Sequence, residues 1–246
     1  MNQTIHTILD HVSVRNFIDQ KLSEKEIEVL VEAAQAASSA SFLQAYSIMS
    51  IDDPKLLKEL VKVGKLQPFI LEAGHFFIFC GDFKRHHDFA KEKEIAIEET
   101  IGGVDALMVG AIDASLAAQN MTIAAESLGM GVCYIGGVRD GIEAISELLD
   151  LPDYVFPVFG LVVGYPAIKN ETKPRFPADA IHHRNEYPNE TLTSTLAYEK
   201  ISEDYYLKRS NGKMQRTWSD TAFKTIINSP RPFMKDYLKQ RGLDKH

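Results

Sequence analysis

Five side chains in two short segments are suited to binding an anion. They are His11, Ser13, Arg15, Lys173 and Arg175. In an extended segment, residues two positions apart point to the same side, so the first three can contact one group together. Pro174 restricts the backbone between the last two, which then form a fork of two cations. Such donors bind phosphate, although the spacing alone also fits scattered surface cations.

A second basic cluster lies in the C-terminal part of the chain. It comprises Lys208, Arg209, Lys213 and Arg216. The cluster surrounds the turn-forming dipeptide Asn211-Gly212, and a mobile basic loop can bind the phosphate of a second, exchanging ligand. A solvated loop face explains these charges equally well.

Three further segments carry groups that fit a flat, hydrogen-bonding ligand. Gly136-Gly137 follows a strand-like run, where the main chain can approach a ring closely or simply turn. Gln67 has an amide that can read a uracil-like edge, but a lone glutamine is more often solvated. A helical segment is followed by three serines whose hydroxyls either end the helix or contact a ligand. These serines are Ser38, Ser39 and Ser41.

Other binding and catalytic motifs do not fit. A dinucleotide-binding domain needs Gly-x-Gly-x-x-Gly between a strand and a helix, whereas the glycines at 129 and 131 precede a strand. The histidine pairs at 86–87 and 182–183 lack the spacing of metal ligands, so no metal site is expected. Cys80 and Cys133 lie in apolar runs and are expected to be buried thiols, not a disulfide or a nucleophile.

The composition is that of an ordinary globular protein. The chain has 246 residues, of which 45% are hydrophobic and 25% charged, and its net charge is −7. This length suits one large domain or two small ones. The acidic balance argues against nucleic acid or an anionic membrane as a partner. We expect no signal peptide and no membrane span, and therefore a cytoplasmic location.

Hydrophobic periodicity predicts helices and strands in mixed order. Strands are expected at 46–51, 75–80, 132–135 and 155–163. A capping box at Ser23–Glu26 predicts the start of one helix. Residues 104–128 are apolar nearly all round, which indicates either the central helix of the domain or half of a subunit interface. The polar, proline-containing composition of residues 165–190 predicts a long connection. The pattern of residues 191–246 predicts two or three further helices. The order indicates a mixed α/β or α+β layer protein.

Five segments, taken in order, resemble one protein family. They are His11–Arg15 (HVSVR), Ala37–Ala45 (ASSASFLQA), Gln67, Tyr134–Gly137 (YIGG) and Lys173–Pro177 (KPRFP). Together they resemble the oxygen-insensitive NADPH nitroreductase and flavin reductase family of the nitroreductase superfamily. The likeness is greatest to the NADPH-dependent nitro/flavin reductases of Gram-positive bacteria. Each motif is weak alone, but five in register across nearly the whole chain are specific.

The resemblance implies a fold and an assembly. The fold would be an α+β sandwich with a mostly antiparallel central sheet flanked by helices. Residues 1–246 would form a single domain, with a core at 1–165 and an FMN-phosphate segment and helical extension at 166–246. The protein would be an obligate homodimer with FMN at the subunit interface, and its C-terminal helices would wrap the partner.

The resemblance also implies residue roles. The FMN phosphate would be held by His11, Ser13, Lys173 and Arg175. Arg15 would lie beside the flavin pyrimidine ring, and Gln67 would read the edge of that ring. The segment that approaches flavin N5 would be Tyr134, Ile135, Gly136 and Gly137. The part contributed by the partner subunit would be Ser38, Ser39 and Ser41. The 2′-phosphate of NADPH would be held by Arg209, with Lys213 or Arg216 as the second cation.

The implied activity is an FMN-dependent, ping-pong reduction by NADPH of nitroaromatics, quinones or free flavin. The chemistry would take place at flavin N5, with no catalytic acid, base or nucleophile among the side chains. Two departures from the family pattern stand out: Val12 and Met214 occupy positions where relatives carry a basic residue. The alternatives are a flavin dehalogenase of the same superfamily, a non-catalytic FMN-binding module, and an interaction protein with surface cations only.

Overall fold

The computed structural model describes residues 1–168, 170–228 and 230–246. These form two compact units. The core unit comprises Met1–Asn170 and Arg231–His246, and the insert unit comprises Glu171–Pro230. None of the described helices combines the length and apolarity that crossing a membrane requires.

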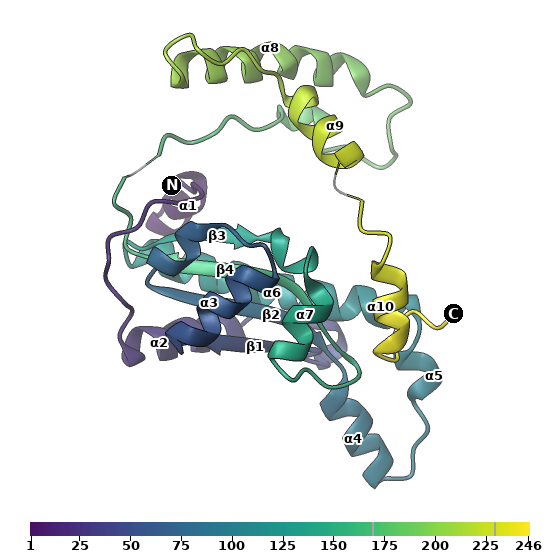
Figure 1. Ribbon diagram of the computed structural model, residues 1–246. Coiled ribbons are helices and arrows are strands. Elements are labelled where there is room, and N and C mark those ends of the chain that lie inside the picture. The colour runs from purple at the N-terminus through teal and green to yellow at the C-terminus, as the bar shows by residue number, and fades with distance from the viewer. Residues whose placement is uncertain (169, 229) are drawn as a thin grey trace. The chain divides into compact units, whose positions relative to one another are not determined.

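The core unit is built on a four-stranded antiparallel sheet (Figure 1). Its strands are β1 (Tyr46–Ile51), β2 (His75–Asp82), β3 (Gly131–Ile135) and β4 (Val155–Gly164). Their order is β1-β2-β4-β3, so β1 and β3 are the two edges. All eight residues of β2 are buried, as expected for a strand covered on both faces. The predicted antiparallel sheet and all four predicted strands are confirmed.

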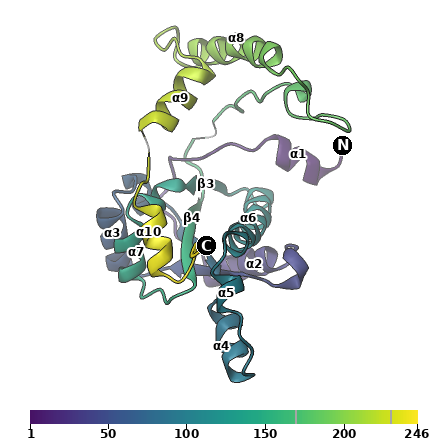
Figure 2. The ribbon, with the colours of Figure 1, turned by 90° about the vertical axis from the view of Figure 1, so that its right-hand side faces the viewer.

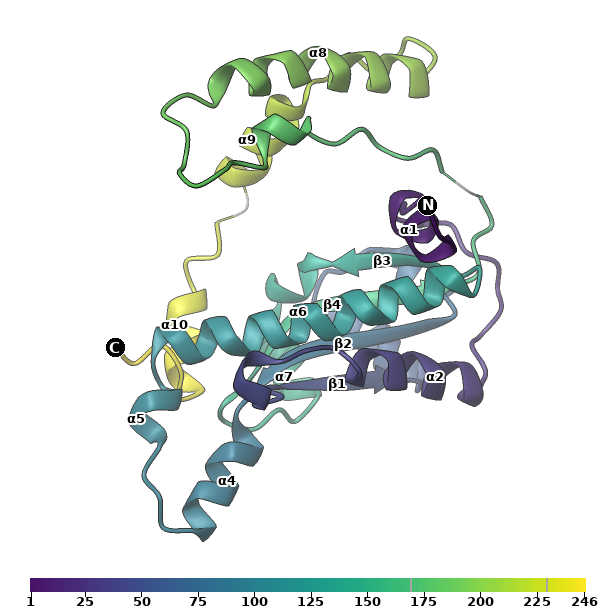
Figure 3. The same ribbon diagram turned by 180° about the vertical axis from the view of Figure 1, so that it is seen from behind.

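Helices cover both faces of the sheet. Figure 2 shows α2 (Glu24–Gln35) and α6 (Val104–Ser127) on one side, with α3 (Pro54–Val63) and α7 (Ile142–Leu148) on the other. Seen from behind, α6 runs along the sheet beside α2 (Figure 3). The capping box at Ser23 and Glu26 is present at the start of α2. The predicted sandwich is therefore confirmed.

The remaining α-helices of the core unit lie around this sandwich. They are α1 (Gln3–Leu9), α4 (Lys84–Glu92), α5 (Glu98–Ile101) and α10 (Met234–Gln240). The chain returns to the core through α10, where Tyr237 is 1% exposed and its hydroxyl lies 2.7 Å from Ser146 Oγ. The last residues of the chain are thus part of the main hydrophobic core.

The long helix α6 is buried on one side only. Its inner face packs in the core through residues such as Ala117 and Met121, both 0% exposed. An outer stripe of large apolar side chains is 43–56% exposed and consists of Val104, Met108, Ile112 and Leu116. Because these residues recur every four positions, they lie on one face. The helix is therefore central to the domain and also has an apolar outer face.

The insert unit contains α8 (Leu192–Arg209) and α9 (Trp218–Asn228), which contact each other. The segment at Phe176 packs on both: its ring centroid lies 4.3 Å from that of Tyr198 and 4.8 Å from that of Trp218. Tyr198 also donates a hydrogen bond to the carbonyl of Pro174, at 2.7 Å. The predicted helical C-terminal region is confirmed.

Candidate functional site

The segment that carries the first three anion donors is extended and lies against β3. The Val14 N–H donates to the Val132 carbonyl at 2.8 Å, and Ser13 forms a parallel bridge with Val132. Val14 is buried, Ser13 is half-buried and Arg15 is exposed, which is the alternation of an extended segment. A side chain at Gly131 would approach Val14 to 2.5 Å, so glycine is required for this contact.

Arg15 lies close to the strand that it accompanies. Burial raises the pKa of the Cys133 thiol, and the positive charge of Arg15 opposes this shift. The pKa of Cys80 is also raised, chiefly by complete burial. Both cysteines are buried and free, as predicted. With a raised pKa, neither thiol is activated as a nucleophile.

The turn that carries Gln67 packs against the end of β3 and the segment after Arg15. Leu66 Cδ2 lies 3.4 Å from the position that a Cβ at Gly137 would take. On the other side, the rings of Phe69 and Phe17 stack with centroids 6.4 Å apart. Gln67 itself is exposed, and its amide does not cap the short 3₁₀ helix that follows. The core unit therefore brings three predicted segments together: His11–Arg15, Gln67 and Gly136-Gly137.

Two predicted residues have side chains already engaged by helix α6. The Nδ1 atom of His11 lies 2.7 Å from a carboxylate oxygen of Glu126, which fixes the ring and leaves Nε2 for any further contact. The hydroxyl of Tyr134 accepts a hydrogen bond from Thr122 at 3.1 Å and donates one to Gln119 at 3.3 Å. Ile135 is buried. What residues 134–137 offer a ligand is therefore mainly their backbone.

The three predicted serines lie at the opposite edge of the sheet. They belong to residues 38–45, which we call the serine loop and which lead directly into β1. Three strand spacings of about 4.8 Å separate β1 from β3, or roughly 14 Å. A single chain does not bring the serines to Arg15.

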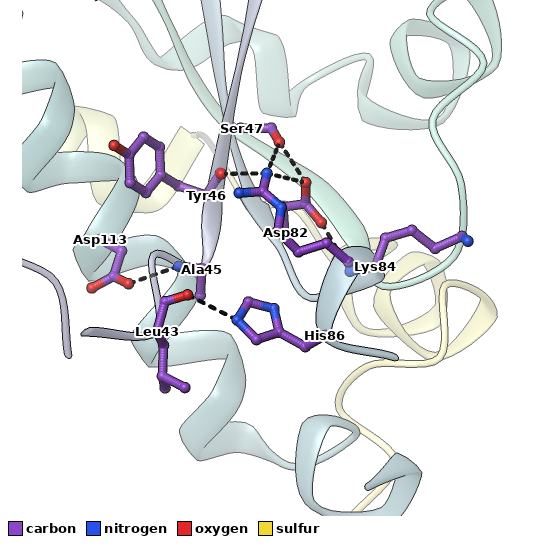
Figure 4. Close-up of polar contacts among 9 residues, drawn as sticks. Leu43, Ala45, Tyr46, Ser47, Asp82, Lys84, His86 and Asp113 are labelled. Atoms are coloured by element: carbon purple, nitrogen blue, oxygen red, sulfur yellow. Dashed lines mark hydrogen bonds and ion pairs between the residues drawn. The ribbon is translucent and has the colours of Figure 1, made fainter. Parts of the chain in front are cut away.

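A polar network that the sequence reasoning missed surrounds the serine loop (Figure 4). Arg85 donates to the Tyr46 carbonyl at 3.0 Å and to Asp82 at 3.1 Å, and Ser47 donates to Asp82. His86 Nε2 donates to the Leu43 carbonyl at 2.8 Å. The sequence contains one signal for a buried polar contact here: Asp113 is the single charged residue in the mostly apolar residues 106–118.

The insert unit gathers cations around Tyr206. Lys173 Nζ lies 5.1 Å from the centroid of its ring, and the Arg216 guanidinium carbon lies 4.5 Å from it. Burial raises the pKa of Tyr206, but hydrogen bonds and charge from Lys173 and Arg216 outweigh burial and lower it. A neighbouring cavity of about 300 Å³ is lined by Tyr206, Arg209, Ser210, Met214 and Arg216. Lys213 is exposed and does not line this cavity.

Lys173 and Arg175 belong to the insert unit, whereas Arg15 belongs to the core unit. Their approach to one another stays a prediction. Within the core unit alone, the predicted donors are the Arg15 guanidinium, the Gln67 amide, the main chain of two glycines, and the side chains of His11 and Ser13. This set suits an anionic ligand with a flat, hydrogen-bonding edge.

Comparison with known proteins identifies the family. Residues 8–165 match the profile of the Nitroreductase family, and residues 173–246 match that of the Nitroreductase family, C-terminal domain. The chain belongs to the nitroreductase family.

Members of this family resemble the chain over its full length. It is 47% identical to a Bacillus subtilis protein named FMN reductase (NADPH), over 100% of both chains. It matches the structure of the NfrA1 nitroreductase of B. subtilis with a TM-score of 0.96 and 45% identity, over 99% of this chain and 100% of the other. It matches the NADPH:FMN oxidoreductase of Vibrio harveyi, complexed with NAD+, with a TM-score of 0.89 and 33% identity, over 100% of both. The family resemblance stated from the sequence is therefore confirmed.

Proposed function

We propose that this nitroreductase-family chain is an FMN-dependent reductase that oxidises NADPH and reduces nitroaromatics, quinones or free flavin. The observation that carries the proposal is the convergence of Arg15, the Gln67 turn and Gly136-Gly137 at one edge of the sheet. The names of the relatives at 47% and 33% identity, FMN reductase (NADPH) and NADPH:FMN oxidoreductase, support the same activity.

The donors of the core unit fit the flavin part of FMN. When bound, FMN supplies two-electron redox chemistry through its N5 atom. The Arg15 guanidinium would lie beside the pyrimidine ring, where a fixed positive charge stabilises negative charge that develops during reduction. Gln67 would hydrogen-bond the edge of that ring, and the Gly136-Gly137 main chain would face N5.

By the family resemblance, the phosphate of FMN would be held by His11, Ser13, Lys173 and Arg175. His11 would use Nε2, because Glu126 occupies its Nδ1. The fork at 173–175 is anchored within the insert unit through the hydrogen bond from Tyr198 to the Pro174 carbonyl. Several charge-assisted hydrogen bonds to the phosphate would hold FMN in place without any contact to its reactive N5 atom.

The site would be completed in a homodimer. The serine loop lies at the edge opposite Arg15, so Ser38, Ser39 and Ser41 would contribute to the FMN site of the partner subunit. The exposed apolar stripe on α6 supports a subunit interface there, because monomeric proteins rarely expose contiguous apolar patches. The C-terminal helices would wrap the partner, and the enzyme would work in the cytoplasm, where NADPH is supplied.

NADPH would bind through its 2′-phosphate to the cations of the insert unit. Arg209 and Arg216 line one cavity with Tyr206, and the Nε atom of Arg216 is buried without a hydrogen-bond partner among the described residues. Of the two alternatives for the second cation, these observations favour Arg216 over Lys213.

The decisive experiment is an anaerobic absorbance titration of the purified full-length protein. We expect a yellow protein whose flavin absorbance is bleached by NADPH, less efficiently by NADH, and restored by a nitroaromatic. A yellow protein that NADPH does not bleach would instead be a flavin-binding module. A protein that neither contains nor binds FMN would refute the proposal.

A further inference from the structure

One buried carboxylate ties the serine loop to helix α6 at two points. Asp113 is 0% exposed, and each of its oxygens accepts a hydrogen bond from a backbone amide of the loop. The Ala40 N–H donates to Oδ1 and the Ala45 N–H to Oδ2, both at 2.9 Å. Figure 4 shows the carboxylate facing the start of β1 at Ala45. Both contacts are made by backbone N–H groups and involve no side chain of the loop.

The loop between these two anchors has a backbone that its residues do not favour. Ser41, Phe42 and Gln44 have φ values of 46°, 59° and 52°, in the left-handed region that side chains other than glycine rarely adopt. No glycine occurs in residues 38–45. The loop therefore does not keep this shape through local preference, and hydrogen bonds must hold it: those to Asp113, the one from His86 to the Leu43 carbonyl and those within the loop.

Stability alone does not account for an aspartate at this position. Both hydrogen-bond donors are neutral amides, and burying a carboxylate costs more free energy than two such bonds return. An apolar side chain would suit the inner face of α6 better. Strained backbone that is retained at such a cost is typical of ligand-binding sites. The strained residues here are presented outward, and Phe42 is 81% exposed.

We propose that Asp113 is a positioning residue of the flavin site. Its carboxylate holds the serine loop in the strained shape that presents Ser39 and Ser41 to FMN in the partner subunit, an inference that rests on the proposed function. Ser39 Oγ accepts a hydrogen bond from the Gln44 N–H at 3.2 Å, so its own proton remains available to a ligand. The loop is thus organised before FMN arrives, which favours binding.

The first test is Asp113→Asn in the full-length protein. The amide has the same shape, but its NH₂ group faces a backbone N–H, so one hydrogen bond is replaced by repulsion. We expect the Kd for FMN, measured by quenching of flavin fluorescence, to rise about tenfold or more. The control is Ser146→Ala in α7, which removes a buried hydrogen bond to Tyr237 in α10. It should lower the melting temperature and leave the Kd for FMN unchanged.

A second variant breaks the same contact from the loop side and leaves α6 intact. Ala40→Pro removes the N–H that donates to Asp113, and Ser39, with φ −131° and ψ 156°, already has the backbone that a following proline requires. It should also weaken FMN binding. This variant decides the question if Asp113→Asn does not fold.

A rescue experiment separates positioning from general stability. Gln44→Gly allows the left-handed backbone at one of the three strained positions without steric penalty, so Asp113→Asn/Gln44→Gly should regain part of the lost FMN affinity. Wild-type FMN affinity in folded Asp113→Asn and Ala40→Pro, or no rescue by glycine, would overturn the role of Asp113. Failure of the wild-type protein to bind FMN would instead refute the proposed function itself.

Discussion

The guanidinium carbon of Arg216 lies 4.5 Å from the centroid of the Tyr206 ring. The ammonium nitrogen of Lys173 lies 5.1 Å from the same centroid. Tyr206 is 7% exposed, so one buried aromatic side chain holds two cations within the insert unit. Lys173 is a predicted ligand of the FMN phosphate and Arg216 of the NADPH phosphate. A guanidinium held in this way is oriented before its anion binds.

Arg216→Gln should raise the KM for NADPH about tenfold or more, because a charge-assisted hydrogen bond to phosphate is lost. The KM for NADH should change little, since NADH lacks the 2′-phosphate. Steady-state kinetics with both donors measure this difference. Lys235→Gln, the same charge change at an exposed position of α10, is the control. Equal increases for NADPH and NADH would show that Arg216 does not read the 2′-phosphate.

Arg15→Ala should weaken FMN binding by about tenfold or more, because the flavin loses its adjacent positive charge. Arg15→Lys should give an intermediate Kd, since lysine keeps the charge but not the planar fork of donors. Fluorescence titration with FMN measures both variants. If Arg15→Ala bound FMN as the wild type does, Arg15 would have no place in the site.

Ile112→Lys tests whether the apolar stripe of α6 is a subunit interface. On a free surface, this change alters the free energy of unfolding by only about 0.5 kcal/mol or less. In an interface it buries a charge, so the dimer should dissociate and lose FMN. Ile112→Ala should remain dimeric, and sedimentation velocity gives the mass of each variant. A dimeric Ile112→Lys protein that retains FMN would exclude the stripe from the interface.

His75 should make the fold less stable in mild acid. Burial lowers the pKa of His75 from its ordinary value of 6.5, while the charge of Asp52 acts in the opposite direction. As the pH falls below 6.5, the unfolded chain therefore binds the proton before the folded chain does. The stability that neutral His75 provides is complete above 6.5 and is lost progressively below it.

The matched variant is His75→Gln, which can still hydrogen-bond Ser50, the present partner of His75 Nε2 at 2.6 Å. Its melting temperature should fall less steeply with decreasing pH than that of the wild type. Parallel curves for the two proteins would assign the acid sensitivity to another group.

The sequence predicted the individual elements better than their arrangement. The strand at His75 was evident because a continuous apolar run is typical of a strand covered on both faces. The strand order was not, because pairing between distant segments leaves no local pattern. That order separates the serine loop from Arg15, which spacing along the chain could not reveal.

The candidate site was predictable only where residue type alone implies chemistry. Arg15, Gln67 and Gly136-Gly137 were found in this way, and the structure brings their segments together. The use of His11 Nδ1 by Glu126 was not foreseen, because the two residues lie 115 positions apart. The role of Asp113 was also missed, because its partners are backbone N–H groups. Every residue except proline has such a group, so the sequence does not show which of them Asp113 contacts.

The return of residues 231–246 to the core makes the insert unit a loop tethered at both ends. Arg231 contacts Asp140 at 2.8 Å, and Tyr237 and Leu243 are buried just beyond it. A protease that cuts within the insert would therefore not release a free tail. It would leave a two-chain complex in which the C-terminal peptide stays bound to the core unit through its buried side chains, as in fragment complementation.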